Sequence, residues 1–314
     1  MNGTGVVWVA ALMLAGAGAV RAQAWTTPRT ADGQPDLEGI WNSASGTPLE
    51  RPDEFKGKEF LTPQEARDWE KRMEVRSRQD ANHDPAAVGT YNDAFWEIGT
   101  RPVKTLRTSM VIDPPDGKIP ALTPEAAAAR KRRIERIRHP DGSEDLSLQD
   151  QCLMFPTGAP PMTPYNYNSN YRIVQTKDQV AIYVEMVHDT RIIPLDGRPH
   201  LPANVRLWFG DSVGRWEGDT LVVDTTNFTD KTSAYGSDKN LHVVERFRRM
   251  DAETILYQFD VDDPTAFTRP WKGELTMSAA TGPIYEYACH EGNYGLPGVL
   301  RGARAEEKAA STPK

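Results

Sequence analysis

The sequence predicts a mainly β protein, in which an antiparallel meander closes into a lipocalin-like barrel after a Pro- and Gly-rich N-terminal region that carries two helices. From about Tyr171 onward, short runs of alternating apolar and polar residues are separated by turn residues. Most of these runs have no helical pattern between them, which favours hairpin connections. Closure into a barrel removes exposed sheet edges, and a two-sheet sandwich is the alternative.

Nine segments have the length and composition of strands. They span residues 171–176, 179–187, 190–194, 205–209, 220–227, 241–249, 254–262, 272–277 and 284–289. Residues 177–178, 216–219 and 251–253 are typical of tight reversals between them. The C-terminal half is therefore expected to be a continuous meander.

The first helix is predicted to begin at Pro63. Thr62 provides an N-cap oxygen, Pro63 suits the first turn, and Glu65 completes a capping box. Apolar residues then recur at helical spacing up to about residue 78.

The second helix is predicted over residues 124–138, behind Thr123 and Pro124. Five basic residues crowd its surface: Arg130, Lys131, Arg132, Arg133 and Arg136. Such a run is typical of a solvated helix face, and an anionic partner is the alternative.

These patterns divide the chain into four segments. We expect a signal peptide at 1–24, a helix-containing region at 25–165 packed on the barrel, the β-barrel at 166–300, and a disordered tail at 301–314. The signal peptide follows from the apolar run at residues 5–20 and from an A-x-A cleavage pattern ending at Ala24. A run of this length is shorter than a membrane span, so we expect a periplasmic or secreted protein without a membrane anchor.

Composition restricts the partners. The net charge of −7 argues against non-specific nucleic-acid binding, which requires a positive surface. The chain has two cysteines, and exported proteins usually pair them. A Cys152–Cys289 disulfide would close a loop of about 137 residues and stabilise the fold by about 4–5 kcal/mol on the chain-entropy model. Two buried free thiols are the alternative.

Three carboxylates occur among apolar neighbours on the predicted strands: Glu185, Glu245 and Glu286. A carboxylate on an apolar face must be paired or protonated, so these residues point to a pocket with acid–base groups. Structural pairing with Arg191, Arg246 or Arg269 is the alternative.

The acid–base hypothesis gives each candidate a role. His188 or His290 moves a proton, with Glu245 or Glu286 as the partner carboxylate. The substrate-binding candidates are Glu185, Arg191, His242, Arg269, Tyr285 and Tyr287. Among them, the arginines would stabilise developing negative charge and the tyrosines would orient the ligand.

No cofactor is predicted. Four histidines lie in or beside the predicted strands: His188, His200, His242 and His290. Three of them, together with Glu291, could hold zinc or another divalent metal. No compact ligand spacing supports this alternative. The segment Gly210–Gly214 fits G-x-S-x-G around Ser212, but a turn and a strand follow it where a nucleophile elbow needs a helix.

Several longer segments together resemble a family of exported bacterial β-rich proteins of unassigned function. They are HDTRIIPLDGRPH at 188–200, GRWEGDTLVV at 214–223, YEYACHEGNYG at 285–295, and residues 35–41. The resemblance spans nearly the whole chain after residue 24. It implies export and a single β-rich unit, and it transfers no catalytic residue.

The sequence predicts two functions of different classes. The first is an exported enzyme that uses acid–base chemistry, by elimination, isomerisation or hydrolysis, on a small polar or aromatic molecule such as a sugar or phenolic. The alternative is a barrel protein that binds such a molecule without changing it. The oligomeric state is left open.

Overall fold

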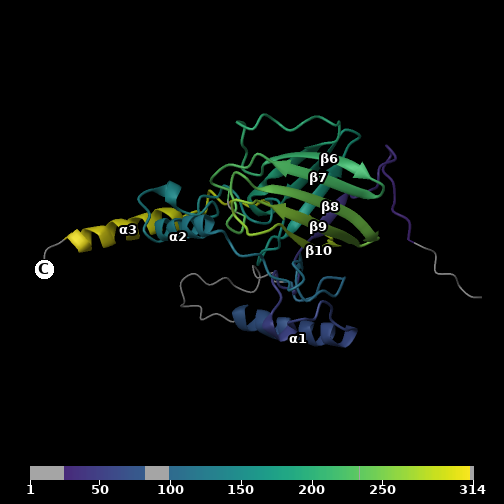
Figure 1. The fold of residues 1–314 in the computed structure, drawn as a ribbon, viewed down its shortest axis with the longest axis horizontal. Coiled ribbons are helices and arrows are strands. Elements are labelled where there is room, and N and C mark those ends of the chain that lie inside the picture. Colours follow the sequence, from purple (N-terminus) through teal and green to yellow (C-terminus); the bar gives the residue numbers. More distant parts are fainter. Residues whose placement is uncertain (1–24, 82–98, 233, 312–314) are drawn as a thin grey trace, which may run out of the picture.

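A ten-stranded antiparallel sheet forms the body of the molecule and curls until it nearly closes into a barrel (Figure 1). The computed structural model describes residues 25–81, 99–232 and 234–311. The strands are β1 Gly39–Asn42, β2 Val111–Asp113, β3 Asn170–Gln175, β4 Gln179–Val184, β5 Thr190–Pro194, β6 Asp211–Glu217, β7 Thr220–Thr226, β8 His242–Asp251, β9 Thr254–Asp262 and β10 Trp271–Ala279. Their order is β5-β4-β3-β1-β10-β9-β8-β7-β6, and β2 pairs with β10. The predicted fold class is confirmed.

The two ends of the sheet, β5 and β6, meet at a seam that side chains close. Arg191 of β5 donates to the hydroxyl of Ser212 on β6 across 3.3 Å. The side chain of Ile193 lies so close to Gly214 that a Cβ there would come within 2.7 Å of it. The absence of a side chain at Gly214 therefore lets the two end strands approach.

The barrel interior is packed with side chains. Alternation along the strands points Trp41, Tyr171, Tyr257, Phe259 and Trp271 inward, and none of them is more than 1% exposed. Aromatic rings pack against one another inside the barrel, and the Tyr257 and Phe259 centroids, on the same strand, lie 5.5 Å apart. The expected hollow that gathers ionisable groups from distant strands is wrong, because these large side chains occupy that volume.

Three helices lie outside the barrel: α1 Pro63–Ala81, α2 Pro124–Arg138 and α3 Gly295–Ser311. Both predicted helices are confirmed. Thr62 accepts from the main-chain N–H of Glu65, and Glu65 accepts from that of Thr62, which completes the capping box. Short 3₁₀ turns occur at Asp53–Phe55, Ser143–Asp145 and Met186–His188.

The C-terminal segment differs from the prediction. Residues 301–311, expected to be disordered, form the second part of α3, while 312–314 lie outside the described residues. Figure 1 shows α3 beside α2, projecting from the barrel. Arg304 of α3 donates to the carbonyl oxygens of Pro140 and Asp141, just beyond the end of α2.

Two predicted strands are absent from the sheet. Residues 205–209 form only a single bridge, between Leu207 and Phe228, and residues 284–289 have no strand structure. Neither segment forms a ladder with a strand of the sheet. Conversely, β6 is not among the nine predicted strands, and its last residues, Trp216 and Glu217, lie in the segment 216–219 that is expected to be a tight reversal. As expected, no helix follows Ser212.

The sheet also crosses the expected boundary at residue 165. β1 is inserted between β3 and β10, so the N-terminal region supplies the centre of the sheet. The division into a separate helical region and a barrel at 166–300 is therefore wrong for β1 and β2. The predicted signal peptide at 1–24 lies outside the described residues.

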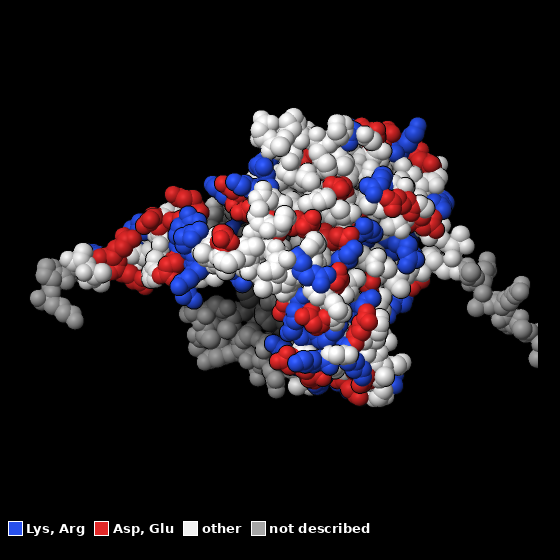
Figure 2. All heavy atoms as spheres, in the orientation of Figure 1, with Lys and Arg blue, Asp and Glu red and all other residues white. Residues whose placement is uncertain are grey.

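Cys152 and Cys289 form the predicted disulfide. Such bonds persist outside the reducing cytoplasm, so the bond indicates a non-cytoplasmic location. Within the described part of the chain, no helix has the length and apolar character needed to cross a membrane. Figure 2 shows acidic and basic side chains intermixed over the visible face of the barrel and α1.

Candidate functional site

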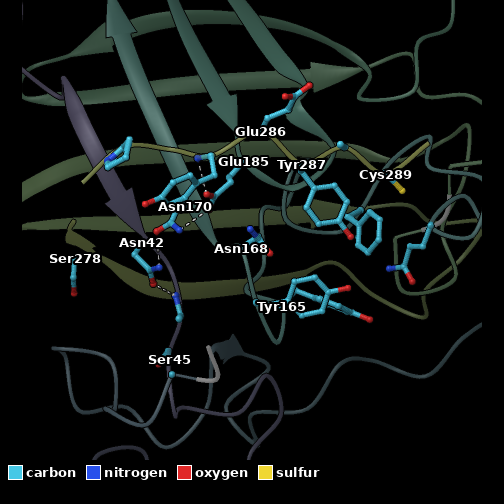
Figure 3. A pocket seen from close by; sticks show the side chains of 18 of the residues that line it. Asn42, Ser45, Tyr165, Asn168, Asn170, Glu185, Ser278, Glu286, Tyr287 and Cys289 are labelled. Atoms are coloured by element: carbon cyan, nitrogen blue, oxygen red, sulfur yellow. Dashed lines mark hydrogen bonds between the residues drawn. The ribbon is translucent and has the colours of Figure 1, made fainter. Parts of the chain in front are cut away.

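A cleft of about 1560 Å³ lies against the outer face of the barrel, where β1, β3 and β10 run side by side. Asn42, Asn170 and Ser278 line it, and their strand neighbours Trp41 and Tyr171 point into the barrel. Because side chains alternate along a strand, the residues beside the buried aromatics face outward. The cleft is thus outside the barrel (Figure 3).

A chain of hydrogen bonds forms the polar centre of this cleft. The Ala44 N–H donates to Oδ1 of Asn42, the Asn42 amide donates to Oδ1 of Asn170 (2.7 Å), and the Asn170 amide donates to Oε2 of Glu185 (2.6 Å). The other carboxylate oxygen accepts from the main-chain N–H of Tyr285 at 3.0 Å. Each amide orientation is fixed by the bond before it, so the centre is rigid.

Glu185 is only 2% exposed and lies at the point where β4 ends. Its backbone is helical, and the next residues form a 3₁₀ turn in which Val187 and His188 have positive φ values of 62° and 47°. Such conformations are strained for side chains other than glycine, and they occur often at functional sites. The turn breaks the predicted alternation and brings Glu185 to the cleft. No ion pair to Glu185 is found within the described ranges.

An aromatic wall stands beside the polar centre. Phe155 packs edge-to-face against Tyr165 and Tyr287, with centroids 5.8 and 6.1 Å away, and Tyr167 packs against Tyr165 at 5.5 Å. All four rings line the cleft. Figure 3 shows Tyr287 and Tyr165 on the side of the cleft away from Glu185.

Residues 281–293, which we call the strap, form the outer wall of the cleft. The Cys152–Cys289 disulfide and the Tyr285–Glu185 bond hold the strap. Nδ1 of His188 lies 3.0 Å from the Tyr287 carbonyl oxygen. A carbonyl only accepts, so Nδ1 carries the hydrogen. The strap therefore depends on one covalent link and several hydrogen bonds.

The predicted catalytic residue Glu245 is inside the barrel. Its carboxylate makes a two-point ion pair with Arg191, at 2.5 and 3.0 Å, and accepts from the Tyr257 hydroxyl at 2.8 Å. Burial alone would lower the pKa of Arg191, but attraction to Glu245 raises it. Burial also raises the pKa of Tyr257, and the charge of Glu245 adds to that effect. The structural alternative, pairing with Arg191, is confirmed for Glu245.

The other catalytic candidates do not meet at one point. Glu286 lines the cleft, but its exposed side chain points away from Glu185 and Asn170 in Figure 3. His188 and His290 are exposed and do not line the cleft. Glu286 and His290 lie on the strap, where residues 284–289 do not form the predicted strand.

Two predicted substrate-binding residues lie elsewhere. Arg269 is exposed and donates to Asp113 at 2.8 Å. His242 is on the outer face of β8, with Nε2 3.1 Å from Asp224, which also lies 3.0 Å from His200. The hydrogen bond to Asp224 raises the pKa of His242, and the same bond lowers the pKa of Asp224.

Tyr285 and Tyr287, predicted to bind substrate, both line the cleft; Tyr285 is 70% exposed and contributes its main-chain N–H to Glu185. Sequence reasoning missed Asn42 and Asn170. The signal that could have identified them is their position on the strands, because Asn42 is next to Trp41 and Asn170 is next to Tyr171, two aromatic residues that face the barrel interior. Within the described residues, no group of three or more His, Cys, Asp or Glu side chains has the arrangement of a metal site.

No protein-family model matches the chain, and no curated protein matches it. Among solved structures, the chain is similar to a mutant of the fluorescent protein UnaG, with 13% identity and a TM-score of 0.23. That alignment covers 36% of this chain and 72% of that chain. A likeness this low carries no argument, so the barrel assignment depends on the strand pairing itself. The resemblance to exported bacterial β-rich proteins stays a prediction.

Proposed function

We propose that this protein binds a small polar or aromatic molecule, such as a sugar or a phenolic, in the cleft on the outer face of the barrel. The carrying observation is the buried Glu185 carboxylate, held by Asn170 and the Tyr285 N–H at the edge of an aromatic wall. Protein sites for sugars and phenols combine these two features, ring surfaces for stacking and oriented polar groups for hydroxyls.

The polar centre suits a ligand that donates hydrogen bonds. A carboxylate has about four lone-pair positions, and the two observed bonds to Glu185 leave the remaining ones available. The amides of Asn42 and Asn170 each have a second hydrogen. A hydroxyl that approaches Glu185 therefore finds both an acceptor and donors. A neighbouring ring on the ligand would lie against Tyr165 and Tyr287.

Calorimetric titration of the full chain with a panel of sugars, phenols and aryl glycosides tests this proposal. We expect at least one class to bind with Kd below about 1 mM, and Glu185→Gln to weaken it tenfold or more. Glu291→Gln is the matched control, because Glu291 is exposed on the strap and does not line the cleft. Equal affinities in both variants would contradict the role of Glu185.

A second candidate function is acid–base catalysis with Glu185 as the proton-transfer group. The observation in its favour is that Glu185 is a buried carboxylate on the cleft wall with no ion pair among the described residues. Desolvated carboxylates of this kind serve as general acids or bases. The earlier candidates Glu245 and His290 do not support this role, since one is locked in an ion pair and the other does not line the cleft.

Turnover distinguishes the two functions. A bound ligand recovered unchanged after long incubation supports binding alone. Product formation that Glu185→Gln abolishes supports catalysis. Product formation that survives Glu185→Gln would exclude Glu185 as the proton-transfer group.

We also propose that the protein acts in the periplasm or after secretion. The disulfide and the predicted leader at 1–24 support this location. Fractionation of cells that express the full chain tests it, since retention in the cytoplasm with reduced cysteines would contradict export.

A further inference from the structure

A second, smaller cavity of about 340 Å³ lies between α2 and the 147–165 segment. Its lining is largely apolar, with Leu148, Met154, Ala159 and Pro160 among its residues. Phe155 and Tyr165, whose rings form part of the cleft's aromatic wall, also line this cavity. Cavities of this size and character accept a small molecule with one or two rings.

Arg133 of α2 is the one charged side chain among the described residues that line this cavity. Its Nη1 donates to the main-chain carbonyl of Lys231 at 3.0 Å, and no ion pair with a carboxylate is found in the described part of the chain. Burial, together with repulsion from Arg136, lowers the pKa of Arg133. An anion in the cavity would oppose this lowering of the Arg133 pKa, because its negative charge would stabilise a partly desolvated guanidinium.

The far side of the cavity is rigid. The Tyr235 hydroxyl donates to Thr163 at 2.8 Å, and the Tyr235 ring packs edge-to-face on Trp271 of the barrel, with centroids 5.5 Å apart. Tyr235 also has a positive φ of 58°, a strained conformation that the surrounding contacts maintain. The cavity thus has a fixed aromatic face and a single cationic side chain.

We propose that this cavity is a second ligand site, which takes a small aromatic carboxylate with its ring among Phe155, Tyr165 and Tyr235 and its carboxylate on Arg133. A guanidinium presents two parallel N–H donors to a carboxylate, which favours an acid over an alcohol of the same shape. Arg133 lines only this cavity, so the acid preference can be tested separately from the function proposed for the larger cleft, although the two sites share Phe155 and Tyr165.

The test is calorimetric titration of the full chain with naphthoate and with the neutral alcohol of the same ring. We expect naphthoate to bind at least tenfold tighter than the alcohol, and Arg133→Gln to remove that preference. Arg132→Gln is the matched control, because Arg132 is on the same helix but exposed and outside the cavity lining.

Three results would overturn the proposal. These are equal affinities for acid and alcohol, an acid preference that survives Arg133→Gln, and the absence of binding tighter than about 1 mM. The first and third use the unaltered protein, so they decide the matter even if Arg133→Gln fails to fold. Failure here leaves the sugar or phenolic proposal for the larger cleft intact.

Discussion

The barrel interior and the outer cleft each bury a glutamate, and the two glutamates are held in different ways. Glu245 faces Arg191 in a two-point ion pair, enclosed by aromatic side chains. Glu185 is nearly as buried, yet its bonds come from an amide and a main-chain N–H. In the first arrangement the guanidinium of Arg191 and the hydroxyl of Tyr257 occupy the carboxylate oxygens, and the second leaves acceptor capacity toward a cavity. Burial alone therefore does not distinguish these two carboxylates; their partners do.

Breaking the interior pair is expected to have one of the two largest effects. Arg191→Met leaves the Glu245 carboxylate buried with only hydroxyl donors, which should lower the free energy of unfolding by about 3–5 kcal/mol. Urea denaturation monitored by tryptophan fluorescence measures it. The double variant Arg191→Met with Glu245→Leu should recover most of that loss, because no unpaired charge remains. A loss below about 1 kcal/mol in the single variant would show that the pair is not structural.

Removing the disulfide should change the outer cleft but not the secondary structure of the barrel. Replacing Cys152 and Cys289 by serine is expected to lower stability by about 4–5 kcal/mol and to weaken ligand binding in the cleft, because the strap loses its covalent anchor. The barrel has no cysteine in its strands, so its far-UV circular dichroism should stay unchanged below the unfolding midpoint. Unaltered ligand affinity in this variant would show that the strap does not shape the cleft.

Glu185→Gln should have a smaller effect on stability and a larger one on binding. Two donors face the carboxylate, and a glutamine amide would accept from only one of them and place its own N–H₂ against the other. We expect a loss of about 1–3 kcal/mol in the free energy of unfolding. A loss as large as that of Arg191→Met would remove the distinction between the two glutamates.

The partly exposed pair of His242 and Asp224 should contribute the smallest effect on stability, and that contribution should depend on pH. The raised pKa of His242 means that its contribution is complete below about 6.5 and is lost as pH rises through the folded value. The lowered pKa of Asp224 means that its contribution is complete above about 3.8 and is lost as pH falls through the folded value. Stability from the pair is therefore greatest between these pH values.

His242→Asn tests this window. Between about pH 5.5 and pH 8.5 the unaltered protein should lose up to about 1 kcal/mol more than the variant, since His242 is partly exposed and solvent weakens the pair. Urea midpoints at both pH values provide the comparison. Identical pH dependence in the two proteins would contradict the assignment to His242.

The fold was largely predictable where local chemistry decides it. Thr62 and Thr123 mark helix starts through their own side chains, and β8 alternates clearly over residues 242–247 because one of its faces is buried. Residues 284–289 alternate equally well but form no strand, because a strand also needs a partner edge. Pairing is a property of the whole sheet, so alternation within a single segment cannot reveal it.

The candidate site was predictable only in part. The composition of their segments predicted the disulfide and four candidate site residues: Tyr285, Tyr287, Glu185 and Glu286. All of these residues line the cleft. Asn42 and Asn170 were missed, since their proximity depends on β1 lying against β3, 128 residues away in the chain. Glu245 was assigned to catalysis because sequence alone could not choose among three possible arginine partners.

The position of β1 has a consequence for how the chain acquires this structure. Its four residues pair with β3 on one side, and Trp41 and Asn42 pair with β10 on the other, so the middle of the sheet is complete only when segments near residues 40, 170 and 278 meet. Pairings so distant along the chain make folding slow, because large loops must close before any contact rewards them. Synthesis would thus be nearly finished before the native sheet can form.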